Sequence, residues 1–304
     1  MANLQQPPLP NQPLEVSPGS LFYIARNFLH NMGLLNKDSR KRFHILDTST
    51  QDQSVRFHRS LKELDSISGR ELFKIGLIYV ASGQEQQSEI LFNDQGSDLY
   101  EEFVAGIGWP VDVKTHSGFI GGLDRNGNLK EMPYYSTATY ESIFHVVTRM
   151  PTNAADPQQI EKKKHVGNDF VHVIWSEHYR DYKPTTISSQ FNDAHIVVYP
   201  MSNGLFRIQI NRKTKVPFFG PLVDGMVLNK HLVCQLVRQT AVNASRRTRM
   251  LSKGYQKPFP TRNAFLKELV HRHKSEKPFD QFLSQLFVNS NASAEKKTAW
   301  LPGK

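Results

Sequence analysis

The run FVHVIW, residues 170–175, is apolar on both sides of an extended chain. Side chains alternate across a strand, so Val171, Val173 and Trp175 would share one face. Phe170, His172 and Ile174 would occupy the other, with His172 as a packed histidine. Five more runs rich in β-branched or aromatic residues are separated by turn residues: KIGLIYV (74–80), SEILF (88–92), SIFHVVT (142–148), HIVVYP (195–200) and LFRIQI (205–210). We interpret all six runs as strands of one sheet.

Segments of helical composition lie between and after these runs, at 98–106, 158–165, 231–251, 261–273 and 279–287. Strands that alternate with helices predict an α/β fold with a mixed central sheet flanked by helices. Apolar periodicity at 21–35 and 57–64 predicts a smaller N-terminal helical lobe, divided by the basic loop DSRKR. The chain would close with C-terminal helices.

Four segments follow from this pattern. Residues 1–18, which contain PPLPNQP, predict a flexible lead-in without a fold. Residues 19–69 would form the N-terminal lobe, which could serve dimerisation. Residues 70–288 would form the main α/β domain, and the polar residues 289–304 a flexible tail.

The composition indicates a globular chain in which 38% of the 304 residues are hydrophobic and 22% are charged. No apolar run approaches the roughly 18 residues that cross a bilayer, and no signal peptide is evident, so we expect a soluble, cytoplasmic protein. The single cysteine, Cys234, excludes a disulfide framework or a cysteine-based zinc site. The net charge of +10 and pI of about 9.6 fit an acidic partner, nucleic acid or plain solubility equally well.

Motifs of nucleotide and hydrolytic chemistry are missing from the sequence: a Walker phosphate loop, HExxH, GxSxG and a complete GxGxxG. The chain is therefore not expected to bind nucleotide by itself. His271 and His273 are two residues apart on a helical pattern, which places them on different helix faces, so we expect surface histidines and no metal site.

The segment QQIEKKKHVGNDFVHVIW, residues 158–175, carries a short lysine-rich helix into Gly167, Asn168 and the strand that follows. Lysines near a helix C-terminus and a Gly-Asn pair after it are ordinary capping chemistry, so a purely structural role is one reading. The segment also resembles the catalytic motif of the Rap GTPase-activating family, in which an asparagine thumb is supplied to a small GTPase. Asn168 falls on the position of the thumb.

Further stretches resemble this family in the same order: KIGLIYV, EEFVAGIGW, GFIGGLD, IFHVVTRMP, HVGNDFVHVIWSEHYRDY, HIVVYPM and VPFFGPL. WSEHYRDY, residues 175–182, is most similar to the Ral-directed alpha subunits, with tuberin as another relative. The resemblance implies a Rap-GAP domain over 70–288 that stimulates GTP hydrolysis on a Ras-family GTPase, Ral first, with Rheb and Rap as alternatives. It implies no cofactor on this chain, because the GTPase carries Mg²⁺ and GTP.

An asparagine suits this task because its carboxamide both accepts and donates hydrogen bonds. Its oxygen can accept from the attacking water while its NH2 donates to a phosphate oxygen. The resemblance thus implies Asn168 as a catalytic residue. His165, one helical turn earlier, would brace Asn168 or touch the GTPase, with capping or a surface role as the alternative.

Six more residues are expected in the GTPase-binding surface: Lys163, Lys164, Gly167, Asp169, Arg246 and Arg247. Gly167 would allow close approach, and Asp169 would anchor its loop by accepting backbone N–H bonds. A solvated face is the alternative for Lys163 and Lys164. The arginines at 246, 247 and 249 suggest an arginine finger, but the resembled family works without one, so they indicate a basic surface that faces a partner or lipid.

Two other functions remain open at the level of sequence. One is a catalytically silent GAP-like scaffold subunit, and the other is a basic nucleic-acid-binding module. The aromatic residues fall mostly in core-like strands rather than among Lys and Arg, which disfavours a stacking platform for single strands. The resembled alpha subunits act with a beta subunit, which implies a partner subunit, a heterodimer and only peripheral membrane contact.

Overall fold

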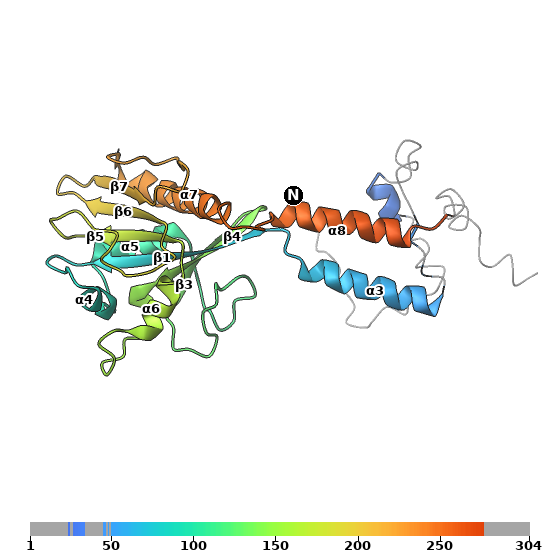
Figure 1. The fold of residues 1–304 in the computed structure, drawn as a ribbon, viewed down its shortest axis with the longest axis horizontal. Helices are drawn as coiled ribbons and strands as arrows, with labels where there is room; N and C mark the ends of the chain where they lie inside the picture. The colour runs from blue at the N-terminus through green and yellow to red at the C-terminus, as the bar shows by residue number, and fades with distance from the viewer. Residues whose placement is uncertain (1–23, 25–26, 34–44, 47, 49, 277–304) are drawn as a thin grey trace, which may run out of the picture. The chain divides into compact units, whose positions relative to one another are not determined.

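The computed structural model describes residues 24, 27–33, 45–46, 48 and 50–276 (Figure 1). The lead-in at 1–18, the loop DSRKR, the helix expected at 279–287 and the tail at 289–304 lie outside the described residues, as do 21–23, 25–26 and 34–35 of the stretch expected to be helical at 21–35. Two compact units emerge, one of residues 67–262 and the other of residues 1–66 with 263–304. Residues 263–276, the described part of the chain beyond 262, cluster with the N-terminal unit, whereas the expected domain ran over 70–288.

The larger unit contains one eight-stranded sheet in the order β2-β3-β4-β1-β5-β6-β7-β8. The four central strands β4, β1, β5 and β6 run parallel, and the outer strands pair antiparallel. The strands are β1 Glu71–Val80, β2 Trp109–Val111, β3 Met132–Ser136, β4 Tyr140–Val146, β5 Val171–Ser176, β6 Ala194–Pro200, β7 Phe206–Arg212 and β8 Val227–Leu228. The expected mixed sheet is confirmed.

Five of the six expected strands are present, but SEILF forms the helix α4, Gln87–Phe92, instead of a strand. The Glu89 carboxylate accepts the backbone N–H groups of Glu85 and Gln86, each at 3.0 Å, which satisfies donors at the start of the helix. These bonds lower the pKa of Glu89. A run of five residues is too short for periodicity to separate the two structures, so the local capping decides.

Helices cover both faces of the sheet (Figure 1). The helices of this unit are α4, α5 Asp98–Ile107, the 3₁₀ turn η1 Val147–Arg149, α6 Ile160–Val166, α7 Lys230–Arg249 and the beginning of α8 Pro258–His273. Residues of α5 and α7 share one apolar cluster with Phe73 and Ile75 of β1. Residues of α4 and α6 share the other cluster with Ile78 and Val80 of the same strand. The sheet is therefore covered by helices on both sides, as the apolar runs predicted.

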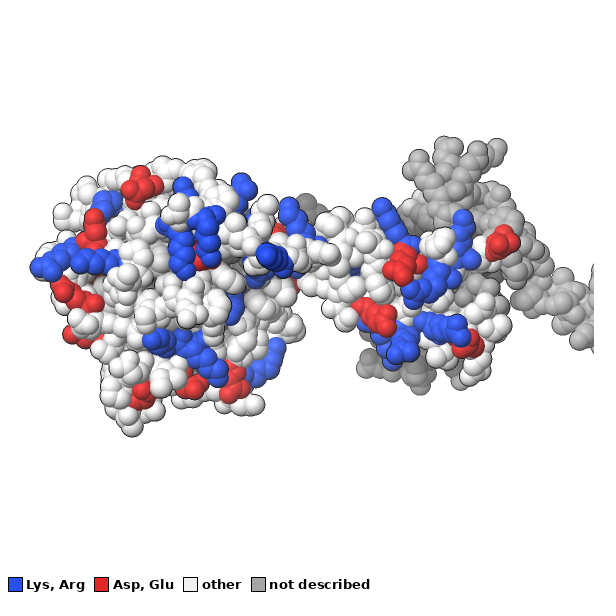
Figure 2. All heavy atoms as spheres, viewed as in Figure 1, with Lys and Arg blue, Asp and Glu red and all other residues white. Residues whose placement is uncertain are grey.

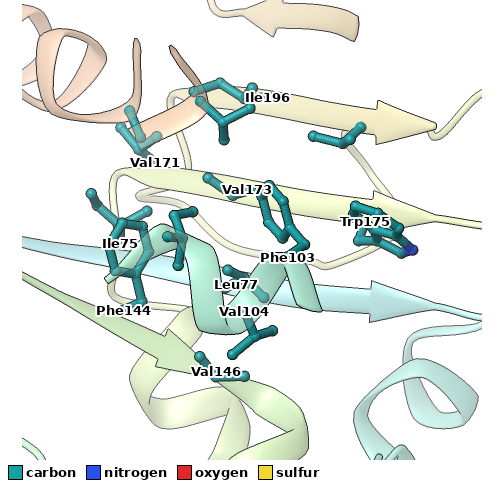
Figure 3. Packing of buried hydrophobic residues seen from close by; sticks show 14 of the residues in the cluster. Ile75, Leu77, Phe103, Val104, Phe144, Val146, Val171, Val173, Trp175 and Ile196 are labelled. Carbon is teal, nitrogen blue, oxygen red and sulfur yellow. The ribbon is translucent and has the colours of Figure 1, made fainter. Parts of the chain in front are cut away.

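The larger core lies between the sheet and α5, where Phe103 and Val104 point onto the strands (Figure 3). Val171, Val173 and Trp175 all belong to this cluster, whereas Ile174 belongs to the cluster on the other face. The expected alternation is confirmed for Val171, Val173, Ile174 and Trp175, but Phe170, which precedes β5, packs against the same cluster as Val171. His172 is buried, as expected for a packed histidine.

The N-terminal unit contains α3, Gln51–Ser66, and the later part of α8. The ring of Phe57 meets that of His273 edge-on, with centroids 5.4 Å apart. An isolated antiparallel bridge joins Leu46 to Lys274. A role of this unit in dimerisation stays a prediction. None of the helices in the described part of the chain combines the length and hydrophobicity that crossing a bilayer requires.

Acid is expected to destabilise the larger unit through His195 of β6. Burial lowers the pKa of this imidazole to about 3, with His172 and Lys213 adding to the effect. Above the unfolded pKa of about 6.5 both states are neutral and the contribution to stability is complete. As the pH falls below that value, only the unfolded state binds the proton, so the free energy of unfolding drops by up to about 1.4 kcal/mol per pH unit. Urea denaturation at pH 7 and pH 5 measures the drop, and His195→Gln should make it smaller; an equal drop in both proteins would contradict the assignment.

Candidate functional site

The helix α6 precedes β5 and begins with a buried polar turn. Gln159 has a left-handed backbone, with φ 46° and ψ 52°, which is uncommon for a residue with a side chain. Its amide donates to the carbonyls of Asn153 and Asp156 and accepts from the Asn153 N–H. The Asp156 carboxylate accepts the N–H of Ile160 at 2.6 Å. These bonds fix the entry to a helix that is only seven residues long.

Lys162 anchors the middle of α6 from inside the protein. The residue is only 1% exposed, and its ammonium donates to the Asn93 carbonyl at 2.9 Å and to Thr152 Oγ1 at 2.7 Å. Burial lowers the pKa of Lys162 to about 8. Sequence reasoning did not single out this lysine. A signal was present, because Lys162 lies four residues before the buried Val166 and so on the same helix face.

The end of α6 is held by a contact from β5. His172 of β5 directs Nε2 at the carbonyl oxygen of Val166, at 2.7 Å. Gly167 follows, and a Cβ added there would lie 2.6 Å from the carbonyl oxygen of Lys163. The last turn of the helix therefore excludes a side chain at Gly167. This local reason stands beside the expected close approach of a GTPase.

Asn168 lies just beyond this turn and is exposed. Its Nδ2 donates to the Lys164 carbonyl at 2.8 Å, one turn back along the chain. One N–H of the amide is thus engaged, while the structure shows no partner for Oδ1 among the described residues. The side chain is held in one orientation with an acceptor and a second donor available to a ligand.

The other residues expected in the site on α6 differ in how far they are exposed. Lys164 is 62% exposed and lies 3.7 Å from Glu161, whereas Lys163 donates to Ser188 Oγ at 3.0 Å. His165 is half-buried, and burial is the main cause that lowers its pKa. Its ring meets that of His145 at a centroid distance of 5.4 Å. Asn168, His165, Lys163 and Lys164 therefore lie together on α6 and the turn after it.

Asp169 does not have the expected place in a GTPase-binding surface. Its side chain is fully buried, so it presents no surface to a GTPase. Its carboxylate lies 2.7 Å from His145 Nδ1 and 3.6 Å from Lys74 Nζ. Among the described residues the partners of the carboxylate are these two side chains and no backbone N–H group, because His145 and Lys74 of the neighbouring strands lie beside it.

Arg246 and Arg247 are not brought together with Asn168. They lie on α7, which packs on the face of the sheet opposite α6. Arg246 pairs with Glu71 at 2.7 Å, and Arg247 is exposed. Lys and Arg lie among Asp and Glu on the face of the molecule shown in Figure 2, without a continuous basic stripe. Among the described residues no group of three His, Cys, Asp or Glu could hold a metal ion.

Comparisons with known proteins identify similar sequences. The chain is 44% identical over 280 residues to the Ral GTPase-activating protein subunit alpha-2 of Mus musculus, which covers 92% of this chain and 15% of that relative. It is 43% identical over 278 residues to the alpha-1 subunit of Homo sapiens, which covers 91% of this chain and 13% of that relative. The chain thus spans a small fraction of the length of these curated relatives.

A solved structure and a family model give the same result. The structure of the TSC2 GAP domain superimposes with a TM-score of 0.55 and 31% sequence identity, over 59% of this chain and 97% of that chain. The family model described as Rap/ran-GAP matches residues 90–268, which include α6, Asn168 and the parallel strands β4, β5 and β6. The chain therefore belongs to the Rap/ran-GAP family.

Proposed function

We propose that this chain stimulates GTP hydrolysis on a Ras-family small GTPase by inserting Asn168 as an asparagine thumb. The observation that supports this most directly is the state of the Asn168 amide. It is exposed at the end of α6, held through Nδ2 by the Lys164 carbonyl, and has Oδ1 available as an acceptor. An attacking water needs such an acceptor, because phosphoryl transfer depends on a positioned nucleophile.

The remaining donor of the amide is equally important. The second N–H of Nδ2 would point toward an oxygen of the γ-phosphate, where negative charge develops in the transition state. A carboxylate in this place would bring charge of the wrong sign, and an alkyl group would bring neither bond. GTP and Mg²⁺ would be carried by the GTPase, so this chain alone would hydrolyse no nucleotide.

One amide does not supply the whole acceleration. GTPase-activating proteins raise the rate by roughly 10³ to 10⁵, which is about 4 to 7 kcal/mol of transition-state stabilisation. A hydrogen bond to a charged group contributes about 1.5 to 3 kcal/mol. The remainder would come from ordering the switch segments of the GTPase around the water, to which the exposed Lys164 and half-buried His165 would contribute contacts.

Ral is the proposed first substrate, with Rheb and Rap as alternatives, because the relatives reported above are named as subunits of Ral GTPase-activating proteins. The word alpha in those names supports a second proposal, that this chain assembles with a partner subunit. We place the activity in the cytoplasm, at the membranes where such a GTPase resides, with peripheral contact only.

A single-turnover assay tests the proposal. GTP-loaded Ral, Rheb and Rap are mixed with increasing concentrations of the chain, and phosphate release is followed. At saturation we expect one of them to be accelerated by roughly 10³-fold or more, and GTP incubated with the chain alone to remain intact. Binding without acceleration of any of the three would favour the silent scaffold instead.

A further inference from the structure

A row of polar residues crosses the sheet beneath the end of α6. In the strand register, His145 of β4 lies beside Gly76 of β1, Gly76 beside His172 of β5, and His172 beside His195 of β6. We call His145, His172 and His195 the histidine row. All three are buried. Neighbouring positions on the same face are apolar, among them Ile78 and Ile174, so the row interrupts a hydrophobic layer.

The row coincides with the place where the chain turns from α6 into β5. Gly76 has no side chain to cover its own position in the sheet. A Cβ there would lie 2.8 Å from Cδ2 of His172 and 3.5 Å from Oδ2 of Asp169. His172 fills that space and contacts the Val166 carbonyl. The polar side chains thus support the turn that carries Asn168, where an apolar layer would leave the Asp169 carboxylate and the Val166 carbonyl without partners.

We infer that Asp169 and His145 form a buried positioning pair for His165. His145 Nδ1 donates to Asp169 Oδ2 at 2.7 Å, which fixes the plane of the imidazole. The ring then meets His165 edge-on, with an interplanar angle of 65° and a centroid distance of 5.4 Å. On its other side His145 lies close to the backbone of Gly121, where a Cβ would be 2.6 Å from Nε2.

The pair matters because α6 is too short to be stable without contacts to the rest of the protein. A helix of seven residues is unstable in isolation, so its side chains depend on tertiary contacts. His165 lies one turn before Asn168 and is only half-buried. A displacement of about 1 Å in a group that orients reactants can lower a rate by about 10²-fold. This inference rests on the proposed function, in which α6 presents Asn168 to a GTPase.

Two substitutions at His145 separate the two contacts of the pair. His145→Asn keeps a donor at the position of Nδ1 but removes the ring that meets His165. His145→Phe keeps a ring but removes the donor to Asp169. Both contacts are required for positioning, so we expect each variant to slow single-turnover hydrolysis at saturation by about 10- to 100-fold. Thermal unfolding followed by circular dichroism reports whether each variant is folded.

A double-mutant cycle distinguishes positioning from a general structural role. In a His165→Ala background, His145→Asn should lower the saturated single-turnover rate by less than about twofold. The reason is that His145 acts through the ring of His165, which this background lacks. An equal factor in both backgrounds would overturn the inference, since His145 would then act independently of His165. Should His145→Phe fail to fold, Asp169→Asn tests the contact between His145 and Asp169 from the other side, because it preserves the volume of the side chain. It is compared in the same way with and without His165→Ala.

A second measurement needs no GTPase and therefore separates this inference from the proposed function. The imidazole ¹H–¹⁵N signals of His165 are recorded in the unmodified chain and in the Asp169→Asn and His145→Asn variants. We expect the His165 signals to shift in both, and those of the exposed His271 to stay in place. His165 signals that remain unchanged in Asp169→Asn would overturn the pair, even in a chain that activates no GTPase.

Discussion

Asn168→Ala and Asn168→Asp are each expected to abolish stimulation of GTP hydrolysis while leaving the protein folded. Alanine removes both the acceptor for the water and the donor to phosphate, and aspartate replaces the donor by a negative charge. Loss of one preorganised donor lowers a rate by about 10² to 10³, so the stimulated rate should fall at least that far. Because Asn168 is exposed and its one bond is to the neighbouring turn, the melting temperature should change little.

Arg247→Ala is the matched control for this experiment. Arg247 is exposed like Asn168 but lies on α7, on the opposite face of the sheet. Removing it should leave the saturated single-turnover rate within about twofold, whereas an arginine finger would be worth about 10³ or more. Unchanged stimulation by Asn168→Ala would refute the thumb, and a loss above about a hundredfold from Arg247→Ala would assign the chemistry to the arginine.

Trp175→Ala is expected to destabilise the larger unit by about 3 to 5 kcal/mol, the usual cost of truncating a large buried aromatic residue. Trp175 is fully buried, with Phe103 at a centroid distance of 5.1 Å and Phe206 at 5.6 Å. Its Nε1 donates to Glu177 Oε1 at 3.0 Å. Truncation would therefore leave a cavity beside two aromatic rings and remove a donor from a carboxylate that also accepts the Tyr79 hydroxyl at 2.8 Å.

Urea denaturation followed by far-ultraviolet circular dichroism measures this loss without depending on tryptophan fluorescence. Phe218→Ala serves as the control, because Phe218 is an aromatic residue of the same unit that is 62% exposed. Its removal should change the free energy of unfolding by less than about 0.5 kcal/mol. Equal effects of the two substitutions would contradict the packing assigned to Trp175.

Long apolar runs were the most predictable part of the fold. Residues 75–80 and 171–175 are buried on both faces of the sheet, so their composition alone indicated central strands. The short outer strands β2, β3 and β8 were not predicted, because they are two to five residues long and β2 and β3 carry Pro110 and Pro133. The helix α4 was mistaken for a strand for a similar reason, since five residues show no decisive period.

The candidate site was predictable in part. Asn168, His165, Lys163 and Lys164 were identified from a contiguous motif, because they are neighbours in the sequence, on α6 and the turn after it. Lys162, His145 and the pairing of Asp169 were not identified. Their partners come from strands and loops far along the chain, since His145 and Asp169 are 24 positions apart and Asn93 and Lys162 are 69 positions apart.

The sequence by itself determined the class of fold, the alternation of strand 170–175 and the motif that ends in Asn168, because these depend on period and local order. Only the tertiary structure decided that Asp169 is buried, that α6 is anchored by a buried lysine, and that three histidines align beneath the turn. The physical reason is that hydrogen bonds and burial follow from the register of parallel strands, and parallel strands join segments that chain order keeps apart.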